Sequence, residues 1–153
     1  MSRTLEEDIA KAGGRTGQIP VELRSTVPAS PASIALVRSA IRGFVDGWRA
    51  EGWVPPAFDD ERACDLALVI TELITNAVLH SGCSADDRLI IRVGLADGKI
   101  DGSVIDPGQG FSTAPGATTP RVDGGLGLFI VGRLVREWGV RDVAEGNEVW
   151  FRF

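Results

Sequence analysis

Three polar side chains interrupt an apolar stretch of the sequence at four-residue spacing. Glu72, Asn76 and His80 lie within VITELITNAVLHSG, residues 69–82. In an α-helix such residues follow one stripe that turns ~40° with each repeat. The stripe offers a carboxylate for proton transfer, an amide oxygen that suits Mg²⁺, and an imidazole. It is equally typical of a surface helix, with Glu72 solvated and with Asn76 and His80 as satisfied core polar groups.

The helix that carries this stripe is expected to start near Asp59 or Asp60 and to end at Ser81-Gly82. Its core face lies within an arc of ~100°, and the polar stripe starts on the flank of that face and drifts toward it. Asp65 shares the flank. The polar groups are therefore expected where a packed helix borders a cleft. The residues of the core face are Leu66, Ile70, Leu73, Ile74 and Ala77.

Two glycine clusters follow further along the chain. Asp106 ends an expected strand and runs into Pro107-Gly108-Gln109-Gly110, where glycine lets a backbone approach a ligand closely. Gly124-Gly125-Leu126-Gly127-Leu128 opens an expected helix, whose free N–H groups can bind phosphate. Taken singly, the first cluster is also typical of a turn and the second of a loop-to-helix joint.

Composition excludes several classes of function. No G-x-x-x-x-G-K-[ST] is present, so a phosphate site here is not a P-loop. His80 is the single histidine, and no G-x-S-x-G accompanies it, which argues against a serine hydrolase. The net charge of −5 disfavours direct binding of nucleic acid.

The location of the protein is predicted from what the sequence lacks. It shows no signal-peptide pattern and no apolar run of the ~20 residues needed to span a bilayer. Cys64 and Cys83 have no metal-binding spacing, and we expect reduced thiols. A cytoplasmic protein without a membrane partner is predicted.

Hydrophobic periodicity predicts one α+β domain in the order β-α-α-β-β-loop-α-β-β. A mobile tail is expected over 1–18 and the domain over 19–153. Ser30 could cap the first helix, with Pro31 at its first position. The expected strands are 19–27, 88–95, 100–106, 140–143 and 148–153, and a third helix is expected over 126–139.

The ordered motifs resemble one superfamily. E-x-x-x-N on a helix, D-x-G-x-G after a hairpin and G-x-G-L at the start of a later helix resemble the GHKL ATPases and kinases, which include gyrase, Hsp90, histidine kinases and MutL. The short chain and the WGV…VWFRF end look most like bacterial anti-sigma-factor serine/threonine kinases. The resemblance implies a Bergerat-type ATP-binding sandwich, with a mixed, mostly antiparallel sheet covered on one face by three helices.

The resemblance also implies a role for each motif residue. Glu72 would be the general base, and Asn76 would coordinate Mg²⁺ on the phosphates of ATP. Asp106 would read adenine, and Gly108 and Gly110 would shape its pocket. Residues 111–124 would form the lid over ATP, and His80 is expected to be structural. The phosphates would be cradled by the second cluster, at Gly125, Leu126, Gly127 and Leu128.

The sequence departs from the kinase pattern at one position. Kinases of this group often carry an arginine just before the second glycine cluster, where this chain has Asp123. Arg121, two residues earlier, is expected to supply the positive charge to the phosphates.

The function implied is an ATP-dependent kinase that phosphorylates a STAS-type anti-sigma antagonist and sequesters an RNA polymerase sigma factor. The resemblance allows a homodimer. The alternative is a module that binds ATP or ADP and controls a protein partner without phosphoryl transfer. A detached histidine-kinase catalytic domain and a simple ATP hydrolase fit less well, because the chain shows no phospho-accepting helix and no transducer domain.

Overall fold

The computed structural model describes residues 21–96, 98–108 and 126–153. The expected tail (1–18) and lid (111–124) lie outside these residues. The predicted order of elements is confirmed. The elements are β1 (Val21–Pro28), α2 (Ala32–Ala50), α3 (Asp60–His80), β2 (Arg88–Ala96), β3 (Lys99–Asp106), α4 (Leu126–Leu134), β4 (Glu137–Val143) and β5 (Gly146–Arg152).

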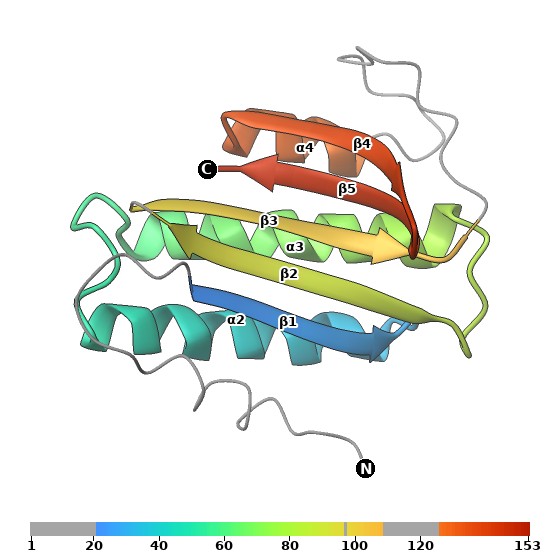
Figure 1. The fold of residues 1–153 in the computed structure, drawn as a ribbon, viewed down its shortest axis with the longest axis horizontal. Helices are drawn as coiled ribbons and strands as arrows, with labels where there is room; N and C mark the ends of the chain where they lie inside the picture. Colours follow the sequence, from blue (N-terminus) through green and yellow to red (C-terminus); the bar gives the residue numbers. More distant parts are fainter. Residues whose placement is uncertain (1–20, 97, 109–125) are drawn as a thin grey trace.

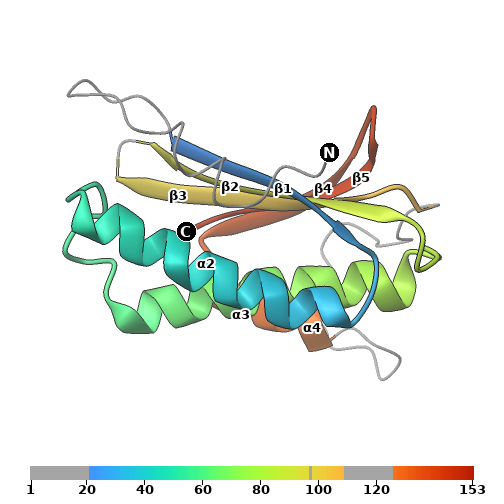
Figure 2. The same ribbon diagram turned by 90° about the horizontal axis from the view of Figure 1, so that it is seen from below.

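The five strands form one sheet in the order β1-β2-β3-β5-β4, so β5 lies between β3 and β4. Every pairing among the described strands is antiparallel. The three described helices cover one face of the sheet, and none of them lies on the other face (Figures 1 and 2). This arrangement confirms the predicted α+β class with helices on one side.

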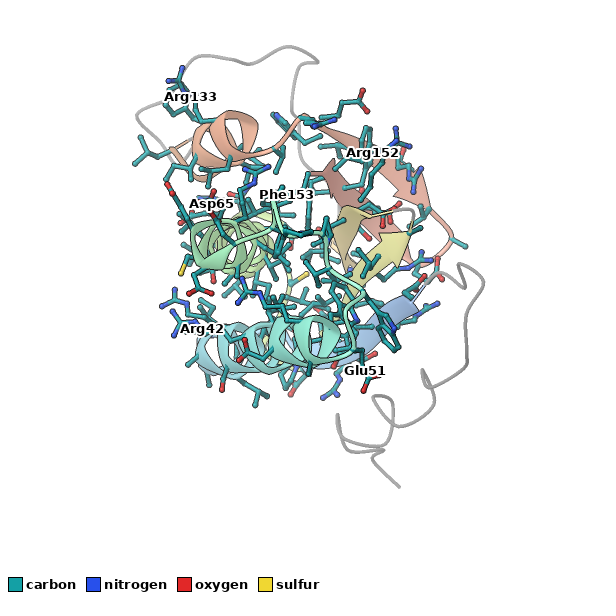
Figure 3. All side chains as sticks on the ribbon, turned by 90° about the vertical axis from the view of Figure 1, so that its left-hand side faces the viewer. Arg42, Glu51, Asp65, Arg133, Arg152 and Phe153 are labelled. Atoms are coloured by element: carbon teal, nitrogen blue, oxygen red, sulfur yellow. The ribbon has the colours of Figure 1, made fainter. Side chains whose placement is uncertain are left out.

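Helix α3 packs between α2 and α4 and also contacts β3. Its predicted core face is fully buried, as are alternate residues of β2, because side chains of a strand point to opposite faces in turn. Phe153 closes one end of this core, where its ring meets Phe58 and Phe151 edge-on. In Figure 3 Phe153 lies between the helices and the sheet. The polar stripe on α3 is therefore carried by a helix that is fixed on three sides.

Two predicted helix boundaries are wrong. Ser30 does not cap α2: the N-cap is Pro31 without a side-chain hydrogen bond, and the Ser33 hydroxyl instead donates to Pro28 O at 2.7 Å. The third helix ends at Leu134 rather than near residue 139. The Arg136 N–H donates to Arg152 O, which starts the pairing of β4 with β5 and leaves no room for another helical turn.

An ion pair with one buried partner lies on the sheet face that no described helix covers. Glu148 is 2% exposed, and its carboxylate pairs with the exposed guanidinium of Arg141. Burial alone would raise the pKa of Glu148, but hydrogen bonds from Arg141 and Ser103, with the charges of Arg141 and Arg92, hold that pKa below its ordinary value. A hollow of about 420 Å³ lies beside this pair.

Among the described helices, α3 alone is long and apolar enough to cross a membrane, judged by length and composition. Half of its apolar window is buried inside the molecule, and the core helix of a globular domain passes the same test. The packing of α3 against two helices and the sheet accounts for its apolar character.

Candidate nucleotide site

Two of the three stripe residues lie as the helical pattern predicts. Helix α3 is capped by Asp59, whose side chain accepts from Arg62 N, and the chain leaves it through Gly82 at φ +77°. Glu72 is half-buried and Asn76 is 5% exposed, so the stripe does turn toward the core over this first repeat. His80, the last helical residue, is exposed. A carboxylate and a buried amide therefore lie one turn apart at the edge of the packed face.

The first turn of α4 lies directly against Glu72. A Cβ added to Gly127 would come within 2.8 Å of Glu72 Oε2. Glycine at this position is therefore required for the carboxylate to sit where it does. The site thus joins a proton acceptor to the N-terminal end of a helix, where backbone N–H groups have no partner within the helix.

At the end of β3 the chain turns around a buried carboxyl group. Asp106 is 1% exposed, and its Oδ1 accepts from the Gly108 N–H at 2.9 Å. Asn147 on β5 lies opposite Asp106 in the strand register, and its Nδ2 donates to Gly108 O at 2.7 Å. The Asp106–Gly108 corner is therefore held from two sides by hydrogen bonds.

The end of α3 completes this corner. Ser81 Oγ donates to Ala77 O and lies 2.8 Å from Cys83 Sγ, while the Cys83 thiol lies 3.9 Å from Asp106 Oδ1. Gly108 packs so closely on the Ser81 carbonyl that a Cβ there would overlap it. The helix that carries Glu72 and Asn76 therefore ends on the turn that carries Asp106.

Burial sets the protonation of this corner. It raises the pKa of Asp106 above the ordinary value of 3.8, and hydrogen bonds from Gly108, Asn147, Ser81 and Cys83 offset part of that rise. Burial also raises the pKa of the Cys83 thiol, against a hydrogen bond with Ser81. At neutral pH the thiol is thus a neutral donor beside the carboxyl group.

Residues 27–153 match the family of histidine kinase-like ATPase domains. The chain belongs to this family. The ATPase domain is also similar in fold to the histidine kinase domain from the Erythrobacter litoralis EL346 blue-light activated histidine kinase, with a TM-score of 0.53 and 21% identity. That similarity covers 97% of this chain and 69% of the other. No curated protein matches the ATPase domain significantly.

Family membership implies that the ATPase domain binds ATP, usually with Mg²⁺. The residues present fit these groups. The amide oxygen of Asn76 is a hard ligand that suits Mg²⁺, and the Glu72 carboxylate one turn away stays available as a proton acceptor. Gly108 and Gly127 pack directly on Ser81 O and on Glu72 Oε2, so neither position has space for a Cβ.

The structure places some predicted site residues and leaves others outside its range. Gly127 lies against Glu72, Asn76 lies one turn further along α3, and Gly108 and Asp106 meet the C-terminal end of that helix at Ser81. Leu126 is 61% exposed, and Leu128 is half-buried against the core. Gly110, Arg121 and Gly125 lie outside the described residues.

Three polar residues of the ATPase domain were not predicted from the sequence. Asn147, Ser81 and Cys83 surround Asp106, although none belongs to a glycine cluster or to the helical stripe. Ser81 carried a weak signal, because it follows the last helical residue. Asn147 lies in a turn-like AEGN segment, and only the pairing of β3 with β5 brings it to Asp106.

Proposed function

We propose that this ATPase domain is a serine/threonine protein kinase that phosphorylates a STAS-type anti-sigma antagonist and binds a sigma factor. The proposal rests on the fold, on family membership and on the order of the three motifs. A cytoplasmic location and the possibility of a homodimer belong to the same proposal.

One observation carries it. The Glu72 carboxylate lies beside the first turn of α4 and one helical turn from Asn76. A phosphate held by the free N–H groups of that turn would bring its terminal phosphorus close to a carboxylate that can accept a proton. Proton acceptor and phosphate cradle then face the same space.

In this reaction Glu72 takes the proton of the acceptor hydroxyl. The hydroxyl oxygen forms its bond to the γ-phosphorus while the bond from that phosphorus to the β,γ-bridging oxygen breaks and ADP leaves. Asn76 would hold Mg²⁺, which would supply positive charge to the phosphates. Asp106 accepts from the amino group of adenine and fixes the base at the other end.

The test is a pull-down from the cell lysate in Mg-ADP and, separately, in Mg-ATP, followed by mass spectrometry and phosphosite mapping. We expect a sigma factor among the captured proteins, and a STAS-domain protein that gains phosphoserine or phosphothreonine in Mg-ATP only. The same two proteins are then purified and assayed directly with radiolabelled ATP.

Variants of α3 make the test specific. Glu72→Gln keeps the size of the side chain and should abolish phosphate transfer while ATP still binds. Asp65→Asn is the matched control, because Asp65 is a carboxylate on the same helix flank and pairs with Arg62. Unchanged transfer in Glu72→Gln would remove Glu72 as the base. Nucleotide binding without phosphorylation of the antagonist would favour the regulatory module without transfer.

A further inference from the structure

The Glu72 carboxylate lies where only a glycine at position 127 allows it. The added Cβ at Gly127 would meet Glu72 Oε2 at 2.8 Å, and its next contacts are other atoms of the same side chain. Gly43 and Gly47 on α2 have no atom within 4 Å of an added Cβ. Gly127 is therefore set against one particular functional group, whereas these other helical glycines face open space.

Any side chain at position 127 would meet Glu72 first, because the three atoms nearest to an added Cβ all belong to that residue. Because Glu72 Oε2 is the far end of a flexible side chain, a Cβ at position 127 would move the carboxylate rather than the backbone.

We propose that Gly127 is a positioning residue for the base. Because glycine has no side chain, the Glu72 carboxylate can lie against the first turn of α4. The inference rests on the proposed function of Glu72. Glycine could have either of two roles at this position. If it allows the backbone to approach phosphate closely, its substitution should weaken ATP binding. If it positions the base, its substitution should slow the chemical step and leave ATP binding unchanged.

The first measurement needs no activity. The carboxyl ¹³C chemical shift of Glu72 is compared by NMR in the nucleotide-free wild type, in Gly127→Ala and in Gly43→Ala, with the resonance assigned by its loss in Glu72→Gln. Gly43→Ala is the matched control, a helical glycine whose added Cβ meets nothing. We expect the signal to move in Gly127→Ala only, with both variants folded.

The second measurement is single-turnover cleavage of Mg-ATP by the full chain, with water as acceptor, together with the Kd for Mg-ATP. A displacement of the base of about 1 Å can slow a reaction roughly 10²-fold, so a loss of that order is expected in Gly127→Ala with the Kd unchanged. Glu72→Asp withdraws the carboxylate by about 1.5 Å, one carbon–carbon bond. In that background Gly127→Ala should cause no further loss.

The outcomes are distinct. An unmoved Glu72 signal in Gly127→Ala, or a raised Kd with unchanged cleavage rate, overturns the positioning role. A further loss in the Glu72→Asp background also overturns it, because the two residues would then act independently. If the signal moves but the wild type neither cleaves nor transfers phosphate, the proposed function has failed, and the positioning role falls with it while the contact itself stands.

Discussion

Asp106 on β3 lies directly opposite Asn147 on β5, and Asn147 Nδ2 donates to the carbonyl oxygen of Gly108 two residues further on. One side chain thus fixes both the strand end and the turn that follows it. If this corner binds adenine, its shape depends on Asn147, which acts through a hydrogen bond to the backbone.

We therefore expect Asn147→Ala to weaken binding of ATP about tenfold, equal to ~1.4 kcal/mol, by loosening the Gly108 carbonyl. Isothermal titration with a non-hydrolysable ATP analogue measures the effect. Asp142→Ala is the control, since Asp142 pairs with Asn147 from β4 and is exposed. Equal affinities in wild type and Asn147→Ala would show that the corner keeps its shape without this amide.

The raised pKa of Asp106 predicts a particular dependence of stability on pH. A carboxyl group whose folded pKa lies above its unfolded value takes up a proton on folding, so its effect on stability improves as pH falls from neutral through the raised pKa. The stability of the wild type relative to Asp106→Asn should therefore increase on acidification toward the ordinary pKa of 3.8. Urea unfolding of both proteins across this range measures the difference, and a constant or opposite trend would contradict the expected ionisation.

Binding measurements with and without Mg²⁺ test whether Asn76 acts as a ligand of the metal. In Asn76→Ala we expect the affinity for Mg-ATP to fall at least roughly tenfold, while the affinity for ATP in EDTA stays that of the wild type. Thr75→Ala is the neighbouring control on the same helical turn. An equal loss with and without Mg²⁺ would mean that the buried amide supports packing or the nucleotide itself.

The Arg141–Glu148 ion pair predicts a pH-dependent loss of folding stability when Arg141 is replaced. Arg141→Met leaves the buried Glu148 with Arg92 and Ser103 only and should destabilise the fold by about 2 kcal/mol at pH 7, less than the loss of a fully buried pair. The lowered pKa of Glu148 contributes stability above its ordinary value of 4.5, and this is lost as pH falls through the lowered value. The cost of Arg141→Met should therefore shrink in acid.

A more exposed ion pair supplies the control for the Arg141→Met prediction. Arg24 and Glu145 also form an ion pair, but both side chains are about half exposed. Arg24→Met should therefore change the free energy of unfolding by less than about 0.5 kcal/mol. Urea unfolding of both variants at pH 7 and pH 4 tests the pair of predictions, and equal costs would show that the burial of Glu148 is unimportant.

Local patterns predicted those parts of the fold that depend on local geometry. The apolar period of α3 and its ends at Asp59 and Ser81 follow from helix geometry and capping, and both are observed. The third helix was predicted too long because Val135 and Trp138 suit either a helix or a strand that packs on the core. Antiparallel pairing with β5, the next strand along the chain, decides for the strand.

The same distinction applies to the candidate site. Glu72 and Asn76 share one helix, so their spacing alone placed them together. The environment of Asp106 depends on the register between β3 and β5, which no short pattern encodes. His80 belongs to the same helical stripe, yet it is exposed. A helical period predicts which side of a helix a residue lies on, but it does not predict how far the neighbouring elements extend along that helix.

The position of β5 within the sheet has a consequence for synthesis. It is the last strand in chain order among the described residues, yet it fills the gap between β3 and β4. Until it leaves the ribosome, β3 keeps an open edge of unpaired backbone groups, which is a template for pairing with other chains. We expect the nascent chain to depend on chaperones until this strand is inserted, and aggregation to increase when translation pauses before residue 146.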